Sequence, residues 1–136
     1  MTRPLPQPDP ATAPYWSGAR QHRLMLPKCT QCSRVHFYPK AICPHCFADT
    51  FRWIEAAGRG TIHSFTIVKR APSPAFEAQV PYVVAIVALD EGPCLMSNVV
   101  SCDPDAVRIG DEVKVEFLDI TDEDTLPVFE LLKQAQ

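Results

Sequence analysis

Six cysteines give this chain its clearest chemical signal, and four of them are spaced as two Cys-x-x-Cys pairs separated by ten residues. Two cysteines in one tight turn can direct both sulfurs at a single point, and two such turns supply a tetrahedron of thiolates. Zinc prefers this ligand set in structural sites, and iron bound in the rubredoxin manner would use the same sulfurs. The spacing predicts one Zn²⁺ ion, with iron as the alternative, held by Cys29, Cys32, Cys43 and Cys46.

A site closed by four protein sulfurs has no open coordination position, so we expect the metal to hold the fold together rather than to activate water. Two disulfides or free thiols are the alternatives, and disulfides need an oxidising compartment. The first residues, MetThrArgProLeuPro, contain no apolar core of signal-peptide length, so we expect a cytoplasmic protein with reduced cysteines. Cys94 and Cys102 are expected to be buried thiols that pack as small apolar residues.

Charge divides the chain into two halves. Up to Trp53 there are seven basic and two acidic residues, a balance of +5, whereas the remainder carries six basic and fourteen acidic residues, a balance of −8. The division predicts two surfaces with different partners. With 136 residues, of which 46% are apolar, the chain is long enough for one core and a small appended module. No apolar run approaches the length of a membrane span.

The first half is expected to contain two segments. Residues 1–13 form a proline-rich leader without a helical period or bulky apolar residues, so we expect it to be disordered. Residues 14–53 are expected to contain a short helix over 14–22 and then the zinc ribbon. The aromatic residues Phe47, Phe51 and Trp53 leave the metal site as a row, and we expect them to pack the ribbon against residues 54–136.

Residues 54–136 have the pattern of a β-barrel. Strands are expected at 58–69, 82–89, 94–100, 113–117 and 126–132, with a single helical turn over 103–107. The apolar alternation slips between Ile62 and Phe65, which predicts a β-bulge. Five strands with a helical turn between the third and fourth are typical of an OB-fold. We therefore predict a mainly β protein in which an N-terminal helix and a rubredoxin-like zinc ribbon precede a five-stranded OB-fold barrel.

As an ordered set, these motifs resemble the domain-of-unknown-function family in which a rubredoxin-like zinc ribbon precedes an OB-fold. The matching motifs include TyrTrpSerGly at 15–18, CysProHisCys at 43–46, GlyArgGlyThrIleHisSerPheThr at 58–66 and CysAspProAspAlaValArgIleGlyAspGluVal at 102–113. Ser33 departs from the pattern, since such ribbons often place glycine after the second cysteine.

Members of that family are associated with thiolases, thiolase-like aldolases, hydroxymethylglutaryl-CoA synthase-like enzymes and acyl-CoA hydratases. The resemblance implies an accessory, non-catalytic subunit. Its helix and ribbon would dock on such a thiolase-like or hydratase partner, and its OB domain would cover or share the entrance for acyl-CoA.

In this interpretation, arginine or lysine would bind the phosphates of CoA, and an aromatic ring would stack on its adenine. The candidate acyl-CoA residues are Arg59, Phe65, Lys69, Arg70, Phe76 and Tyr82. Phe65 could instead be a core residue, and Lys69 with Arg70 a solvated strand end. The candidate partner-docking residues are Tyr15, Trp16, Phe37 and Tyr38, although Tyr15 and Trp16 could instead cap the metal module.

Two other functions are alternatives. An OB-fold can bind single-stranded nucleic acid through aromatic rings in a positive groove, but the balance of −8 in the barrel half opposes a polyanion. An independent enzyme would need a catalytic constellation. His63 and Ser64 are adjacent, so in a strand they point to opposite faces, and no glycine-rich phosphate loop is present. We therefore expect no enzymatic activity of its own, no membrane association and no nucleic acid as the main partner.

Overall fold

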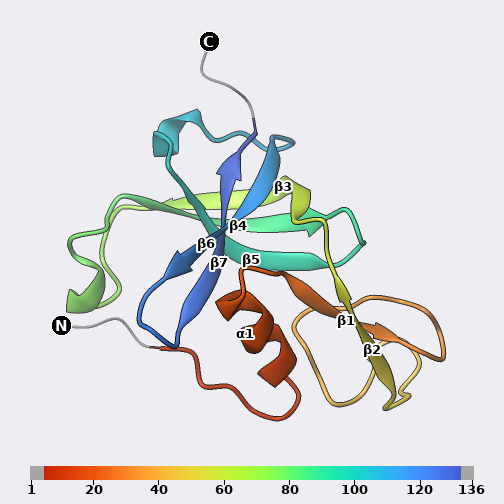
Figure 1. Cartoon of the computed structure of the whole chain (residues 1–136). Helices are drawn as coiled ribbons and strands as arrows, with labels where there is room; N and C mark the ends of the chain where they lie inside the picture. Colours follow the sequence, from red (N-terminus) through yellow and green to blue (C-terminus); the bar gives the residue numbers. More distant parts are fainter. Residues whose placement is uncertain (1–4, 133–136) are drawn as a thin grey trace.

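The computed structural model describes residues 5–132. One helix, α1 (Ala13–Arg20), precedes a two-stranded antiparallel sheet made of β1 (Met25–Cys29) and β2 (Phe51–Glu55) (Figure 1). Five further strands close a barrel: β3 (Arg59–Val68), β4 (Tyr82–Leu89), β5 (Cys94–Val100), β6 (Glu112–Asp119) and β7 (Thr125–Leu131). Short 3-10 turns, η1 (Pro74–Phe76) and η2 (Pro104–Ala106), lie in two connections. The predicted mainly β fold is confirmed.

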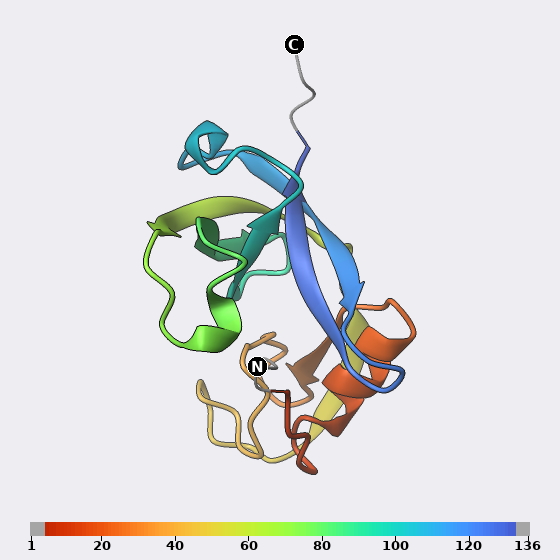
Figure 2. The same cartoon turned by 90° about the vertical axis from the view of Figure 1, so that its left-hand side faces the viewer.

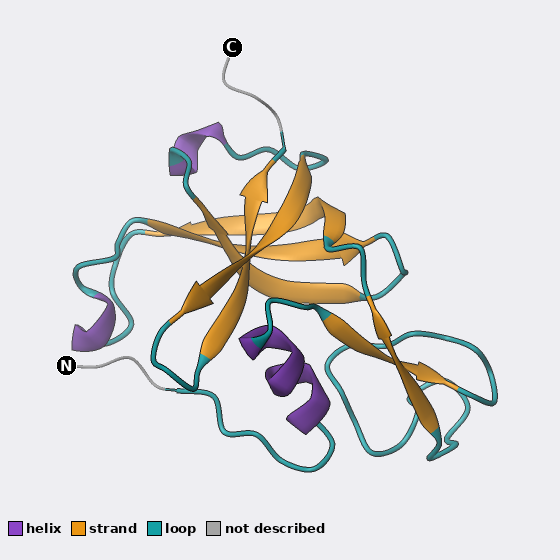
Figure 3. Cartoon of the chain, in the orientation of Figure 1, coloured by secondary structure: helices purple, strands orange, loops and turns teal. Residues whose placement is uncertain are grey.

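The barrel has the strand order β3-β4-β5-β7-β6, and β3 pairs with β6 to close it. Neighbouring strands are antiparallel except β5 and β7, which pair in parallel through Val99 and Val100. This is the topology of an OB-fold, with η2 between the third and fourth barrel strands as the sequence predicted (Figure 3). The register of β3 shifts between Ile62 and Ser64, which confirms the predicted bulge.

The core is continuous from the barrel into the helix and the ribbon. Inside the barrel, alternate residues of the strands are buried, among them Ile62, Val87 and Phe129. The same cluster includes Tyr15 of α1 and Leu26 of β1, so the three parts share one apolar interior. Figure 2 shows α1 beside the lower end of β6 and β7 and next to the ribbon. A ribbon of this size buries little on its own, so it depends on this shared core.

A polar contact fastens the turn after α1 to the barrel. His22 Nε2 lies 3.1 Å from Asp119 Oδ1, and the His22 ring stacks on Phe117 with centroids 5.1 Å apart. Thr125 Oγ1 also donates a hydrogen bond to Asp119 Oδ1, at 2.7 Å. The carboxylate of Asp119 therefore accepts from both sides of the junction.

The proline-rich segment has a defined turn directly before α1. The Asp9 and Thr12 side chains each accept a hydrogen bond from the backbone N–H of the other residue, both at 3.0 Å, and Thr12 is buried. The expected disorder of the leader therefore does not extend to this turn, and residues 1–4 lie outside the described residues. Strand β2 crosses the expected boundary between residues 53 and 54, and the division into 14–53 and 54–136 stays a prediction.

None of the helices in the described part of the chain has the length and apolar character needed to cross a membrane.

Candidate functional site

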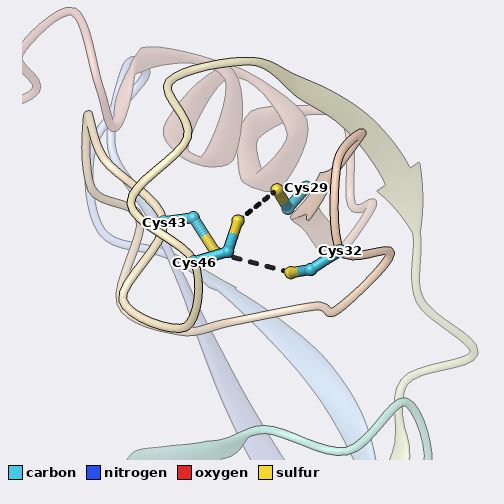
Figure 4. A group of neighbouring side chains, drawn as sticks. All are labelled: Cys29, Cys32, Cys43 and Cys46. Carbon is cyan, nitrogen blue, oxygen red and sulfur yellow. Dashed lines mark hydrogen bonds between the residues drawn. The ribbon is translucent and has the colours of Figure 1, made fainter.

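The four cysteines of the two Cys-x-x-Cys pairs converge on one point of the ribbon. Their sulfurs all lie within 4.8 Å of one another, with Cys29 Sγ 3.5 Å from Cys46 Sγ and Cys32 Sγ 3.7 Å from Cys43 Sγ (Figure 4). A tetrahedron with Zn–S bonds of about 2.3 Å has S···S edges of about 3.8 Å, so the arrangement fits a zinc ion. A disulfide would need sulfurs about 2 Å apart. The structure therefore favours the metal over the disulfide alternative.

Hydrogen bonds within each knuckle explain why the sulfurs converge. In the first knuckle, the N–H of Gln31 donates to Cys29 Sγ at 3.4 Å and the N–H of Ser33 donates to the Cys29 carbonyl at 3.0 Å. Ser33 has a φ of 64°, in the left-handed region that glycine adopts most easily. The chain therefore turns sharply after Cys32 despite the serine.

The second knuckle repeats this pattern. The N–H of His45 donates to Cys43 Sγ at 3.4 Å, and the N–H of Phe47 donates to the Cys43 carbonyl at 2.9 Å. Phe47 has a φ of 67°, so it stands in the same left-handed position as Ser33. Two equivalent turns thus present their sulfurs to a common centre, as expected for a rubredoxin-like site.

The thiols differ in how easily they ionise. The backbone N–H of Cys32, and after it that of Gln31, donates to the sulfur of Cys29. These hydrogen bonds outweigh the effect of burial and lower the pKa of Cys29 to about 7. Although the N–H of Ala48 favours the thiolate of Cys46, burial and the other three sulfurs raise its pKa to about 12. Cys29 therefore ionises more readily than Cys46, and a bound metal ion would take all four cysteines as thiolates.

His36 is the buried polar residue nearest in sequence to the knuckles, and it is not part of the sulfur cluster. Its Nε2 accepts a hydrogen bond from the N–H of Lys40 at 3.3 Å, and its ring meets Phe51 edge-on. Burial, followed by the charges of His45 and Lys40, lowers the pKa of His36. The residue therefore acts as a neutral member of the ribbon interior.

The four residues predicted to dock a partner form one aromatic cluster between α1 and the ribbon. The Tyr15 ring lies edge-on to Trp16, Phe37 and Tyr38, with centroids 4.8, 5.3 and 6.1 Å apart. Tyr15 is only 4% exposed, whereas Tyr38 is 43% exposed. Burial, with a contribution from Tyr38, raises the pKa of Tyr15. The cluster and strands β5 and β7 line a groove of about 340 Å³. Docking through these residues stays a prediction.

The six candidate acyl-CoA residues do not form a single site. Phe76 and Tyr82 come together, with ring centroids 6.1 Å apart, and Lys69 and Arg70 belong to the same connection between β3 and β4. Phe65 packs against the core. Arg59 begins β3, nine residues before its end, and at about 3.3 Å per residue it lies on the order of 30 Å from that connection. A role of the β3–β4 connection in acyl-CoA binding stays a prediction.

Two expectations about exposure are wrong. Phe47 does not pack the ribbon against the barrel but is 79% exposed, and Ile42 on the same loop is 53% exposed; of the predicted row, Trp53 does pack against the core. Cys94 is exposed rather than buried. The sequence contained one signal for the exposure of Phe47, which directly follows the second cysteine of its pair. In both knuckles this residue has a left-handed backbone, and the side chain of Phe47 there points away from the knuckle interior.

The fold and the sulfur cluster define a protein with a rubredoxin-like zinc ribbon and an OB-fold. Residues 16–52 match the family described as "ChsH2, rubredoxin-like zinc ribbon domain", and residues 53–118 match "ChsH2, C-terminal OB-fold domain". A "DUF35 domain-containing scaffold protein" of Methanothermobacter thermautotrophicus is 39% identical over 105 residues, which cover 76% of this chain and 78% of that protein. The chain belongs to the DUF35 family. The match of residues 16–52 to a zinc ribbon family also favours zinc over iron as the metal.

Two further relatives differ in length. A "Probable enoyl-CoA hydratase alpha subunit" of Thermomonospora curvata is 39% identical over 127 residues, and the chain spans only 39% of that protein's length. A chain of the solved structure "Ltp2-ChsH2(DUF35) aldolase" is 38% identical with a TM-score of 0.83, over 93% of this chain and 98% of that one. The same ribbon and barrel thus occur both as a separate chain and as part of a longer protein.

Proposed function

We propose that this protein is an accessory, non-catalytic subunit of an enzyme that processes acyl-CoA. It docks on a thiolase-like partner, such as a thiolase, aldolase or synthase, or on a hydratase, and it helps to form the partner's acyl-CoA site. The observation that carries the proposal is the likeness to the chain of the Ltp2-ChsH2(DUF35) aldolase, which matches over 93% of this chain.

The chemistry of the site supports an accessory role. The sulfur quartet leaves no open coordination position for a substrate or an activated water. Within the described residues, cysteines form the single group of potential ligands close enough to hold a metal ion. The bond-making groups of the reaction would therefore come from the partner, while this chain supplies surface and shape.

The aromatic cluster supports a docking role for the helix and the ribbon. Tyr38 is exposed beside a groove that Leu95, Met96 and Pro127 of the barrel also line. Exposed aromatic side chains backed by a packed core are frequent anchors of protein interfaces. On the barrel, the β3–β4 connection with Lys69, Arg70 and Phe76, together with Tyr82 at the start of β4, would face the acyl-CoA, with the two cations near its phosphates.

Co-expression with a thiolase-like enzyme and, separately, with a hydratase from the same genome tests the proposal. We expect one of them to co-elute with this chain in size-exclusion chromatography, and the enzyme to lose acyl-CoA turnover or solubility when the chain is left out. A K69A/R70A double variant should raise the KM for acyl-CoA of the complex, whereas R59A, at the other end of β3, should not. Turnover of acyl-CoA by the isolated chain, or tight binding of single-stranded oligonucleotides without binding to either enzyme, would overturn the proposal.

A further inference from the structure

The second knuckle loop carries an exposed apolar pair that the fold itself does not use. Phe47 and Ile42 flank the ligand Cys43 on this loop, and neither belongs to the core nor to the side chains packed against it. Among the described residues, Phe47 makes no contact with another aromatic ring. We call Ile42 and Phe47 the knuckle pair.

Phe47 carries two costs at once. Its left-handed φ of 67° is unfavourable for any residue with a Cβ and more so for a bulky one. Its ring also remains in water, where burial would be favourable. Glycine at this position would remove both costs without changing the hydrogen bond from its N–H to the Cys43 carbonyl. The fold itself therefore does not require a phenylalanine at this position.

The metal centre holds the pair in place. The backbone of Phe47 is bonded to that of Cys43, and Cys46 precedes it, so metal binding fixes the loop on both sides. A loop whose backbone is already ordered loses little freedom when a partner covers it, which increases the affinity. The backbone that carries the knuckle pair is thus preorganised in the zinc-loaded protein.

Positive charge surrounds the pair. Lys40 precedes Ile42 by two residues, and Arg34 Nη1 lies 3.4 Å from His45 Nδ1 on the same loop. Residues 24–54 contain four basic residues and a single carboxylate, Asp49. Within the described residues, neither Arg34 nor Lys40 is in an ion pair. The complementary surface is therefore an apolar pocket bordered by carboxylates.

We infer that the knuckle pair is the anchor by which this chain binds its enzyme partner, inserted into an apolar pocket rimmed by aspartate or glutamate. The inference rests on the proposed function and adds to it the contact that carries most of the affinity. It places the main anchor at the tip of the ribbon and leaves the exposed Tyr38 of the aromatic cluster as a further contact.

The test compares zinc-loaded F47A with the wild-type chain in binding to the enzyme that co-elutes with it. F47A removes the ring but keeps a Cβ at the left-handed position, so the loop's backbone preference changes little. We expect the Kd to rise about tenfold or more, as for an interface hot spot. Zinc content and the thermal midpoint should stay at wild-type values.

Ile109 provides the matched control. It is 69% exposed, in the connection between η2 and β6, which Figures 1 and 2 place at the end of the barrel away from the ribbon. I109A should bind the enzyme as the wild type does. An R34E/K40E variant should associate more slowly at low salt, with the difference shrinking at high salt.

Each outcome decides the inference. If the complex forms and F47A binds as tightly as the wild type, the anchor lies elsewhere and the accessory function stands. If F47A instead abolishes self-association seen by light scattering, the pair binds a second copy and the inference is wrong. If neither enzyme binds the wild-type chain, both the inference and the proposed function are wrong.

Discussion

Ser33 and Phe47 occupy equivalent positions in the two knuckles, and both hold a left-handed backbone, with φ of 64° and 67°. Each donates its N–H to the carbonyl of the first cysteine of its own knuckle. The two residues differ only in the side chain that they place outside the turn. The two knuckles therefore show a small polar residue and a large apolar residue at the same backbone position.

Ser33→Gly should stabilise the zinc-loaded protein. Glycine adopts the left-handed region without a Cβ clash, and the gain of about 1–2 kcal/mol exceeds the entropic cost of glycine, which is about 0.5–1 kcal/mol. The thermal midpoint, measured by circular dichroism, should rise by a few degrees. Ser33→Ala keeps a Cβ and should bring no such rise; an equal gain in both variants would show that the backbone conformation is not the cause.

Cys43→Ser should remove the metal and unfold the ribbon. Cys43 is fully buried, and three sulfurs with a hydroxyl cannot reproduce a closed thiolate site. We expect the zinc content, measured by mass spectrometry of the acid-released metal, to fall from one ion per chain to near zero, with loss of near-UV dichroism. Cys94→Ser, which changes an exposed cysteine outside the cluster, should retain its zinc. Retention of the metal in Cys43→Ser would disprove the ligand assignment.

Asp119→Asn should weaken the junction between the α1–β1 turn and the barrel in a pH-dependent manner. Hydrogen bonds from Thr125 and His22 lower the pKa of Asp119. A carboxyl group whose pKa is lower in the folded state stabilises the protein at pH values above its unfolded pKa of about 4. This contribution is lost as the pH falls through the lowered pKa. The thermal midpoint of the variant should be below that of the wild type at pH 7, and the difference should shrink towards pH 3.

Asp122 lies in the loop that follows Asp119, the last residue of β6, and serves as its control. It is exposed and makes no side-chain hydrogen bond to another described residue. Asp122→Asn should have the same thermal midpoint as the wild type at both pH values. A pH-independent loss in Asp119→Asn would contradict the role given to its carboxylate.

Gly60→Ala should destabilise the barrel where β3 pairs with β4. A Cβ at residue 60 would lie 2.4 Å from the carbonyl oxygen of Ala88 and 2.8 Å from Val87 Cγ1. The backbone oxygen cannot move without disturbing the pairing of Gly60 with Leu89, so we expect a loss of about 1–3 kcal/mol in the free energy of unfolding. Urea denaturation measures it, with Thr61→Ala, at the exposed next position, as the control. Equal midpoints for the two variants would contradict the close packing.

The sequence predicted those features that depend on local spacing. Two Cys-x-x-Cys pairs lead to a sulfur cluster because each pair forms its own turn, and the barrel strands follow from their apolar residues and the turns between them. The helical turn before Val107 supplied the order of an OB-fold. These features require no knowledge of how distant segments meet.

The features that it did not predict depend on such meetings. Tyr15 is buried because the barrel packs against α1, and Phe47 is exposed because nothing in the described chain reaches the ribbon tip. Composition alone cannot distinguish these two aromatic residues.

The shared interior of helix, ribbon and barrel sets the mechanical character of the molecule. Because Tyr15 and Leu26 belong to the same cluster as Phe129, the metal-bearing end cannot swing relative to the barrel without opening the core. A protein held at the sulfur end and a ligand held at the far strands would keep a constant separation and angle. We therefore expect the helix, the ribbon and the barrel to move as one rigid unit rather than about a hinge.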